Sequence, residues 1–164
     1  MTTEERQADG RDDETPMERA DRNFVELLQG FRVAVTGVQV LFAFLLTVPF
    51  SPGFERSADV DHRLYYVALV GAAVASMFFI APVAQHRILF RQGLKESLVK
   101  RSNLYGMVGT LALAVSMTAA TLMVVDYLFS GPMPVITGGG VAILACWLWF
   151  VEPLIHRAKG ADRP

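Results

Sequence analysis

Residues 33–54 read VAVTGVQVLFAFLLTVPFSPGF, a stretch without any Asp, Glu, Lys, Arg or His. Three further stretches share this property, namely 64–85, 102–125 and 127–151. Because a helix rises about 1.5 Å per residue and the hydrocarbon core is about 30 Å thick, each stretch can hold one spanning helix of about 20 residues. The sequence therefore predicts an all-α fold, a four-helix transmembrane bundle.

The composition also favours a membrane protein over a soluble domain. Of the 164 residues 52% are hydrophobic, and the formal net charge of -1 gives no basic excess that would indicate nucleic-acid binding. The chain is too short to cover four helices that are apolar on all sides with polar ones, which argues against a soluble fold. Cys146 is the only cysteine, which excludes an intrachain disulfide and a CxxC motif.

Lys and Arg residues outside these stretches gather on one expected side of the membrane. Thirteen precede the first stretch, connect the second to the third, or follow the fourth: Arg6, Arg11, Arg19, Arg22, Arg32, Arg87, Arg91, Lys95, Lys100, Arg101, Arg157, Lys159 and Arg163. The other side has only Arg56 and Arg63. Because basic residues near helix ends stay in the cytoplasm, we expect a multi-pass protein of the cell (plasma) membrane, the inner membrane, with both termini cytoplasmic. The first span is then a retained anchor and not a cleaved signal.

Three regions are expected along the chain. Residues 1–14 are acidic and polar, which predicts a disordered cytoplasmic tail. Residues 15–157 form a single four-span membrane domain, and residues 158–164 form a short cytoplasmic tail. Thr15, Pro16 and Glu18 fit a capping box that starts an amphipathic cytoplasmic helix before the first span, with Gly30 as a hinge.

The two connections on the other side contain turn residues. The first begins with Ser51-Pro-Gly and ends where Ser57 or Asp59 is suited to cap the second span. The second contains Gly131 among several turn residues and predicts a tight turn before the fourth span.

Basic residues recur every four positions after the second span. Arg87, Arg91 and Lys95 would therefore line one side of a second amphipathic cytoplasmic helix, between spans 2 and 3. Together with Lys100 and Arg101 they form a candidate contact to anionic lipid headgroups. The alternative is a solvated loop that serves only to orient the chain.

Gln39 is the strongest polar group well inside a span. An amide in hydrocarbon is unfavourable unless it bonds to a neighbour, so we expect it to join helices; alternatively it lines a polar pathway. No Asp, Glu, Lys, Arg or His lies at mid-membrane depth, which argues against proton coupling or voltage sensing. Small residues spaced four apart predict close helix packing: Ala68, Ala72, Ser76, Gly106, Thr110, Ala114, Thr118, Gly138, Ala142 and Cys146.

Few residues suggest chemistry. His86, Glu152 and His156 could share a metal at the cytoplasmic face, but Pro153 biases Glu152 away from helical geometry, and we expect neither a metal nor a cofactor. No Walker loop, GxGxxG, HExxH or GxSxG motif is present, so we expect no enzyme activity.

Two segments of the chain resemble a known family. The first comprises residues 26–29, 32–39, 41–46 and 49–50, and the second comprises residues 81–84, 86–87 and 90–91. Over about residues 20–157 the chain resembles a family of small four-span membrane proteins of unknown function from actinobacteria. The resemblance implies a four-helix integral membrane protein and supplies no activity.

Two functional hypotheses follow. In the first, the chain is a structural or accessory membrane protein that packs with itself or with partner spans, surrounded by membrane lipids and without nucleic acid. In the second, it is a small oligomeric transporter or channel of ion or proton antiporter type, whose pathway forms only between copies.

Overall fold

The computed structural model describes residues 15–89 and 95–161, and within these ranges the chain is helical with no strand. The elements are α2 (Pro16–Thr47), η1 (Val48–Phe50), η2 (Phe54–Arg56), α3 (Asp59–Leu89), α4 (Lys95–Leu128), α5 (Met133–Cys146), the π-helical turn η3 (Trp147–Val151) and α6 (Glu152–Ala161). The predicted tail 1–14 and residues 162–164 of the predicted tail 158–164 lie outside the described residues, whereas residues 158–161 form the end of α6.

Four segments of the described chain are long and apolar enough to cross a membrane. They are Val25–Phe50, Asp59–Gln85, Arg101–Leu128 and Met133–Lys159. Each contains or overlaps one of the four charge-free stretches, because uncharged side chains are what the hydrocarbon core tolerates. The predicted all-α four-helix architecture is confirmed.

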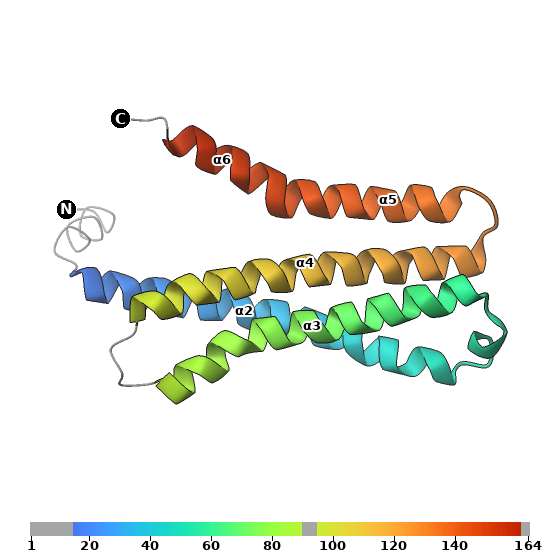
Figure 1. Cartoon of the computed structure of the whole chain (residues 1–164), viewed down its shortest axis with the longest axis horizontal. Coiled ribbons are helices and arrows are strands. Elements are labelled where there is room, and N and C mark those ends of the chain that lie inside the picture. The colour runs from blue at the N-terminus through green and yellow to red at the C-terminus, as the bar shows by residue number, and fades with distance from the viewer. Residues whose placement is uncertain (1–14, 90–94, 162–164) are drawn as a thin grey trace, which may run out of the picture.

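The four spans are arranged around α3 and α4, which lie side by side (Figure 1). The first span, α2, packs mainly on α3, and α5 packs mainly on α4. The start of α2 and the end of α6 lie at the same end of the bundle, as an even number of spans requires (Figure 1). We call the opposite end, which contains η1, η2 and the α4–α5 turn, the loop end.

Two buried clusters form the core. One consists of Phe31, Val38, Ala75 and Phe79, and the other of Leu45, Ala68, Ala72 and Ala119. The Phe31 and Phe79 rings lie 5.9 Å apart between centroids, which joins α2 to α3. Small side chains on α3 let it approach α4 closely, since a Cβ added at Gly71 would lie 3.1 Å from the Ala112 carbonyl oxygen.

The first helix differs from the prediction at one point. It begins at Pro16, as predicted, but it continues through Gly30 to Thr47 as one helix, so the predicted hinge is wrong. Leu27 and Leu28 before Gly30, and Phe31 after it, pack in the same core cluster. This common contact keeps the two halves of α2 in line. The predicted cytoplasmic helix and the first span are therefore one continuous helix.

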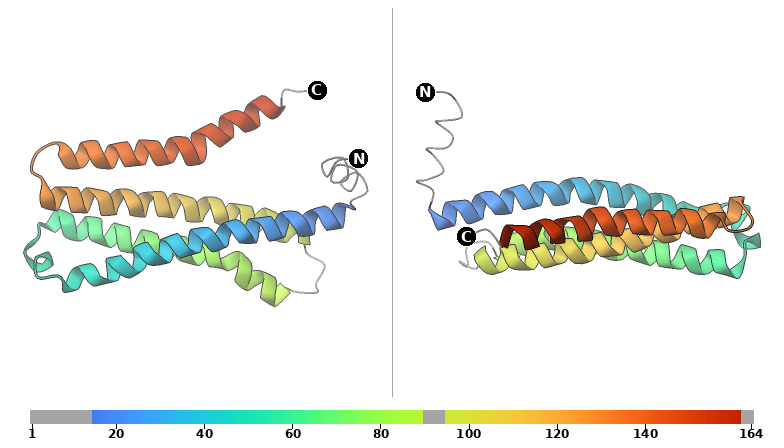
Figure 2. Two further views of the ribbon diagram at one scale, coloured as in Figure 1. Left: turned by 180° about the vertical axis from the view of Figure 1, so that it is seen from behind. Right: turned by 90° about the horizontal axis from the view of Figure 1, so that it is seen from above.

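The fourth span contains the main irregularity. Proline lacks an N–H and its ring clashes with the carbonyl four residues earlier, which for Pro153 belongs to Trp149. The wider turn of η3, in which the Glu152 N–H donates to the Trp147 carbonyl, accommodates the ring, and the axis bends between α5 and α6 (Figures 1 and 2). Glu152 keeps helical angles (φ -59°, ψ -49°), so the expected distortion at Glu152 is wrong.

The turn between α4 and α5 is as tight as predicted. Only four residues separate Leu128 from Met133, and Gly131 has a positive φ of 94° that favours glycine. After the turn, Gly138 is buried against the side chain of Leu122, which fixes α5 on α4.

Candidate functional site

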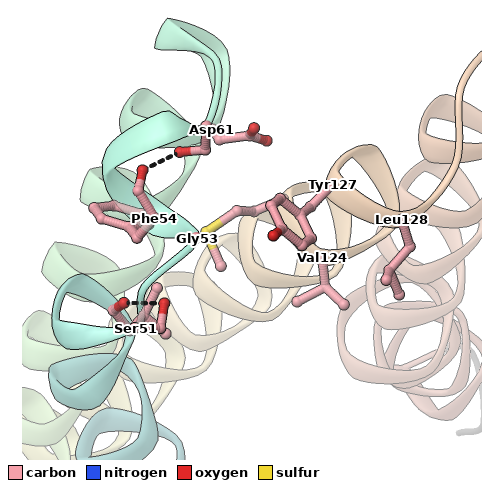
Figure 3. Close-up of a pocket in the computed structure, with 10 residues that line it drawn as sticks. Ser51, Gly53, Phe54, Asp61, Val124, Tyr127 and Leu128 are labelled. Atoms are coloured by element: carbon pink, nitrogen blue, oxygen red, sulfur yellow. Dashed lines mark hydrogen bonds between the residues drawn. The ribbon is translucent and has the colours of Figure 1, made fainter.

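A pocket at the loop end, which we call the Asp61 pocket, lies between the η1–η2 segment and the end of α4 (Figure 3). Its volume is about 360 Å³. Ten residues line it: Val48, Ser51, Gly53, Phe54, Ser57, Asp61, Met123, Val124, Tyr127 and Leu128. Most of this lining is apolar, and Asp61 is its only acidic residue.

Asp61 is held in place by the start of α3. The helix begins at Asp59, and the backbone N–H of Ala58 donates to Asp61 Oδ2 at 3.2 Å. Ala58 is therefore the N-cap residue, and Asp61 at N3 forms the one side-chain bond of a capping box that is possible without a polar N-cap side chain. The prediction that Ser57 or Asp59 caps this helix is wrong, because the Ser57 hydroxyl donates instead to the Phe54 carbonyl at 2.7 Å.

The second carboxyl oxygen of Asp61 has no such partner. Asp61 is only 4% exposed, and its Oδ1 forms no hydrogen bond with any described residue. The carboxyl group extends from α3 toward the side of the pocket where Tyr127 lies (Figure 3). Buried polar atoms are nearly always hydrogen-bonded, so an unpaired carboxyl oxygen beside a cavity indicates a place for a ligand.

Aromatic rings hold the wall of the pocket on α3. The Phe54 ring lies 4.6 Å from the His62 ring and 5.1 Å from the Tyr65 ring, the latter in an edge-to-face arrangement. Opposite this wall, the Tyr127 hydroxyl lies against Gly53, where a Cβ would collide with it. The η1–η2 segment is thus fastened to both α3 and α4.

The two serine hydroxyls of the pocket are engaged with the backbone of their own segment. They donate to backbone carbonyls, Ser51 to Val48 and Ser57 to Phe54, each at 2.7 Å. Among the described residues, neither hydroxyl is paired with a basic side chain of the kind that activates a serine nucleophile. The arrangement offers one carboxyl oxygen and an apolar surface.

A second, more open cavity of about 500 Å³ lies toward the other end of the bundle. It is lined by apolar residues of α2 and α4, with Thr110 as a hydroxyl and Trp149 of η3 at its edge. Phe79 of α3 also lines it, and none of the lining side chains is ionisable.

Gln39 lies on the outer surface of α2. Its side chain is exposed and forms no hydrogen bond within the described chain. The neighbouring Thr36, Gly37, Val40 and Ala43 are also at least partly exposed, so this face of α2 is not covered by another helix. Within the described chain Gln39 faces away from the other helices, and its role as a link between helices or as part of a pathway remains a prediction.

The predicted lipid-contact residues are only partly described. Arg87 is exposed near the end of α3, Lys95 begins α4, and Arg101 is exposed on α4. Arg91 lies outside the described residues, and the side chains of Lys95 and Lys100 are not described. Arg87 and Lys95 thus belong to two different helices, so the predicted stripe on one helix between the spans is wrong, and the contact to anionic lipid remains a prediction.

The predicted metal site also remains untested. Glu152 and His156 are both exposed on α6, and no group of three His, Cys, Asp or Glu side chains suited to a metal is found among the described residues. The side chain of His86 is not among them.

Asp61 is absent from the site residues predicted from sequence. No sequence signal marked it, because Ala58 has no side chain that could form the reciprocal bond of a capping box, and Asp61 follows a polar segment expected to be solvated. The folding of η1 and η2 over the start of α3 buries this carboxyl group.

The fold and the pocket define a multi-pass, all-α membrane protein without a recognisable catalytic centre in its described part. A family model matches residues 13–153, and the chain belongs to that family, a family of unknown function (DUF6328). No curated protein and no solved structure matches the chain.

Proposed function

We propose that this chain is a structural or accessory membrane protein that packs, through the face of α2 carrying Gln39, with a second copy of itself or with partner spans. The single observation behind the proposal is the exposed amide of Gln39 within the span Val25–Phe50. In hydrocarbon an unbonded amide is unfavourable, and a neighbouring helix removes that penalty.

A second copy is the simplest partner. A glutamine amide both donates and accepts hydrogen bonds, so two Gln39 side chains related by a two-fold axis satisfy each other. Gly37 supports a close approach, because a Cβ added there would meet nothing within 4 Å and the backbone itself is open to a partner.

Disulfide cross-linking in native membranes tests this proposal. In a Cys146→Ala background, Ala43→Cys lies one helical turn from Gln39 on the exposed face and is expected to form a cross-linked dimer. Ile143→Cys, 72% exposed on α5, is the control and should stay monomeric. Adding Gln39→Leu should lower the dimer yield about three-fold, since such a bond contributes about 0.6 kcal/mol in membranes. Equal cross-linking at both positions would contradict the proposal.

The same variant separates this function from transport. An oligomeric transporter or channel of antiporter type would pass ions in liposomes, and Gln39→Leu would alter that flux. The buried polar side chains of the described chain are Asp61, Ser102 and Ser116, which are too few for a polar pathway through one copy. A flux abolished by Gln39→Leu at unchanged melting temperature would favour the transporter hypothesis.

We further infer that both termini are cytoplasmic in the plasma membrane, the inner membrane. Support comes from the thirteen basic residues expected at that end and from the shared end of α2 and α6. We also infer that anionic lipids contact five basic residues: Arg87, Arg91, Lys95, Lys100 and Arg101. We infer in addition that the chain is not an enzyme. For the family as a whole, we infer an actinobacterial origin and four spans throughout.

A further inference from the structure

The Asp61 pocket combines two features that rarely occur together. Its walls are apolar and aromatic, yet it contains a carboxyl group that is only 4% exposed, with one oxygen unpaired. None of the ten lining residues is Lys, Arg or His, so no side chain of the pocket supplies a positive charge. Asp61 Oδ2 accepts from the Ala58 N–H, whereas Oδ1 is buried without a partner among the described residues, which destabilises the fold unless a ligand binds there.

We propose that the Asp61 pocket binds an organic ammonium ion with an apolar or aromatic body. The ammonium group donates to Asp61 Oδ1, and the apolar body lies against Val124 and the Phe54 ring. Charge-assisted hydrogen bonds are the stronger ones, and an ammonium group is also attracted to aromatic faces. The volume of about 360 Å³ suits a small ligand.

A bare metal ion fits this pocket less well. Calcium takes six to eight oxygen ligands, about 2.3–2.6 Å away, whereas the pocket offers one free carboxyl oxygen. The hydroxyls of Ser51 and Ser57 already donate to backbone carbonyls, so each is oriented toward its own segment. The body of an organic ammonium ion would contact the apolar walls, whereas a metal ion would not.

The ligand reaches Oδ1 by displacing a side chain of the wall. Oδ1 is covered by surrounding atoms in this structure. Leu128 is 62% exposed, which leaves its side chain room to rotate, whereas the Tyr127 hydroxyl packs on Gly53. The opening is thus on the α4 side, toward which the Asp61 carboxyl group extends (Figure 3).

Titration of the full-length protein in lipid nanodiscs tests the proposal, with benzylammonium as the probe and saturation-transfer NMR as the measurement. Empty nanodiscs correct for partitioning into lipid. We expect saturable binding of benzylammonium, with benzyl alcohol at least about ten-fold weaker, because it lacks the charge-assisted bond to Asp61. Equal binding of the alcohol, or no saturable binding of benzylammonium, would overturn the proposal.

Matched variants identify the group responsible. Asp61→Asn keeps an oxygen that can accept from the Ala58 N–H but removes the carboxylate, and should weaken benzylammonium binding about ten-fold. Asp59→Asn removes the same charge two residues away, outside the pocket lining, and should leave binding unchanged. An equal effect of both variants would show that benzylammonium responds only to the charge of the loop end, and would also overturn the proposal.

A third variant covers the case in which Asp61→Asn fails to fold. Val124→Phe fills the pocket from α4 and leaves Asp61 in place; Val124 is 50% exposed, so the larger side chain is compatible with folding. Benzylammonium binding should be lost in this variant at an unchanged melting temperature. Binding retained by Val124→Phe would place the probe elsewhere and refute the assignment.

Discussion

The hydroxyl of Ser116 on α4 donates a hydrogen bond of 2.6 Å to the backbone carbonyl oxygen of Ala68 on α3. Both residues are completely buried, and they lie 48 positions apart in the sequence. The bond forms where Gly71 lets the two helices approach, with a Cβ at that position 3.0 Å from Ser116 Cβ. It joins the two central spans at the point where their backbones are close.

Ser116→Ala should therefore destabilise the protein. Removing an interhelical bond in a membrane lowers the free energy of unfolding by about 0.6 kcal/mol, with a maximum of about 1.7 kcal/mol. Reversible unfolding in mixed micelles measures this change. Ser76→Ala is the control, because the Ser76 hydroxyl donates to the Ala72 carbonyl of its own helix. Similar losses for both variants would show that the contact between helices adds nothing.

Gly138→Ala should loosen α5 from α4. The added Cβ collides with the Leu122 side chain, and overpacking of this kind destabilises by about 1–3 kcal/mol. Gly140→Ala is the matched control, since a Cβ there meets nothing within 4 Å. Thermal unfolding should show a lower melting temperature for Gly138→Ala alone, and Leu122→Ala should restore part of it. A stable Gly138→Ala variant would refute the close contact.

Cysteine labelling in intact cells tests the orientation of the chain. In the Cys146→Ala background, Ala58→Cys at the loop end should react with an impermeant thiol reagent, because that end has only two basic residues and is therefore expected to be external. Gly93→Cys, in the connection between α3 and α4, should react only after the cells are opened. Labelling in the opposite sense would invert the topology.

A triple substitution of Arg87, Arg91 and Lys95 by Ala tests the lipid contact. Insertion should be unchanged, since Lys100 and Arg101 still mark the inner side. Added anionic lipid should raise the melting temperature of the native protein over neutral lipid, and the triple variant should lose that gain, because each basic group at an anionic surface contributes about 1 kcal/mol. An identical response of both proteins would show that these residues serve only to orient the chain in the membrane.

Much of the fold is readable along the chain. The four charge-free stretches predict the four spans, Pro16 predicts the start of α2, and Gly131 predicts the tight turn before α5. These features depend on local properties, namely solvation of charge, the fixed φ of proline and the tolerance of glycine for a positive φ. The same local reasoning failed at Gly30 and Glu152, where contacts or a π-helical turn outweigh the preference of a single residue.

The sequence alone therefore specifies how many helices can cross a membrane and where they begin and end. Which face of each helix meets a neighbour is decided only by the tertiary structure, because lipid tails are as apolar as the core and hydropathy cannot distinguish them. Gln39 faces outward and Ser116 inward for this reason, although both are polar residues within apolar stretches. Asp61 is buried because η1 and η2 fold over the start of α3. That contact joins separate segments of the chain, and a local sequence pattern cannot predict how such segments pack.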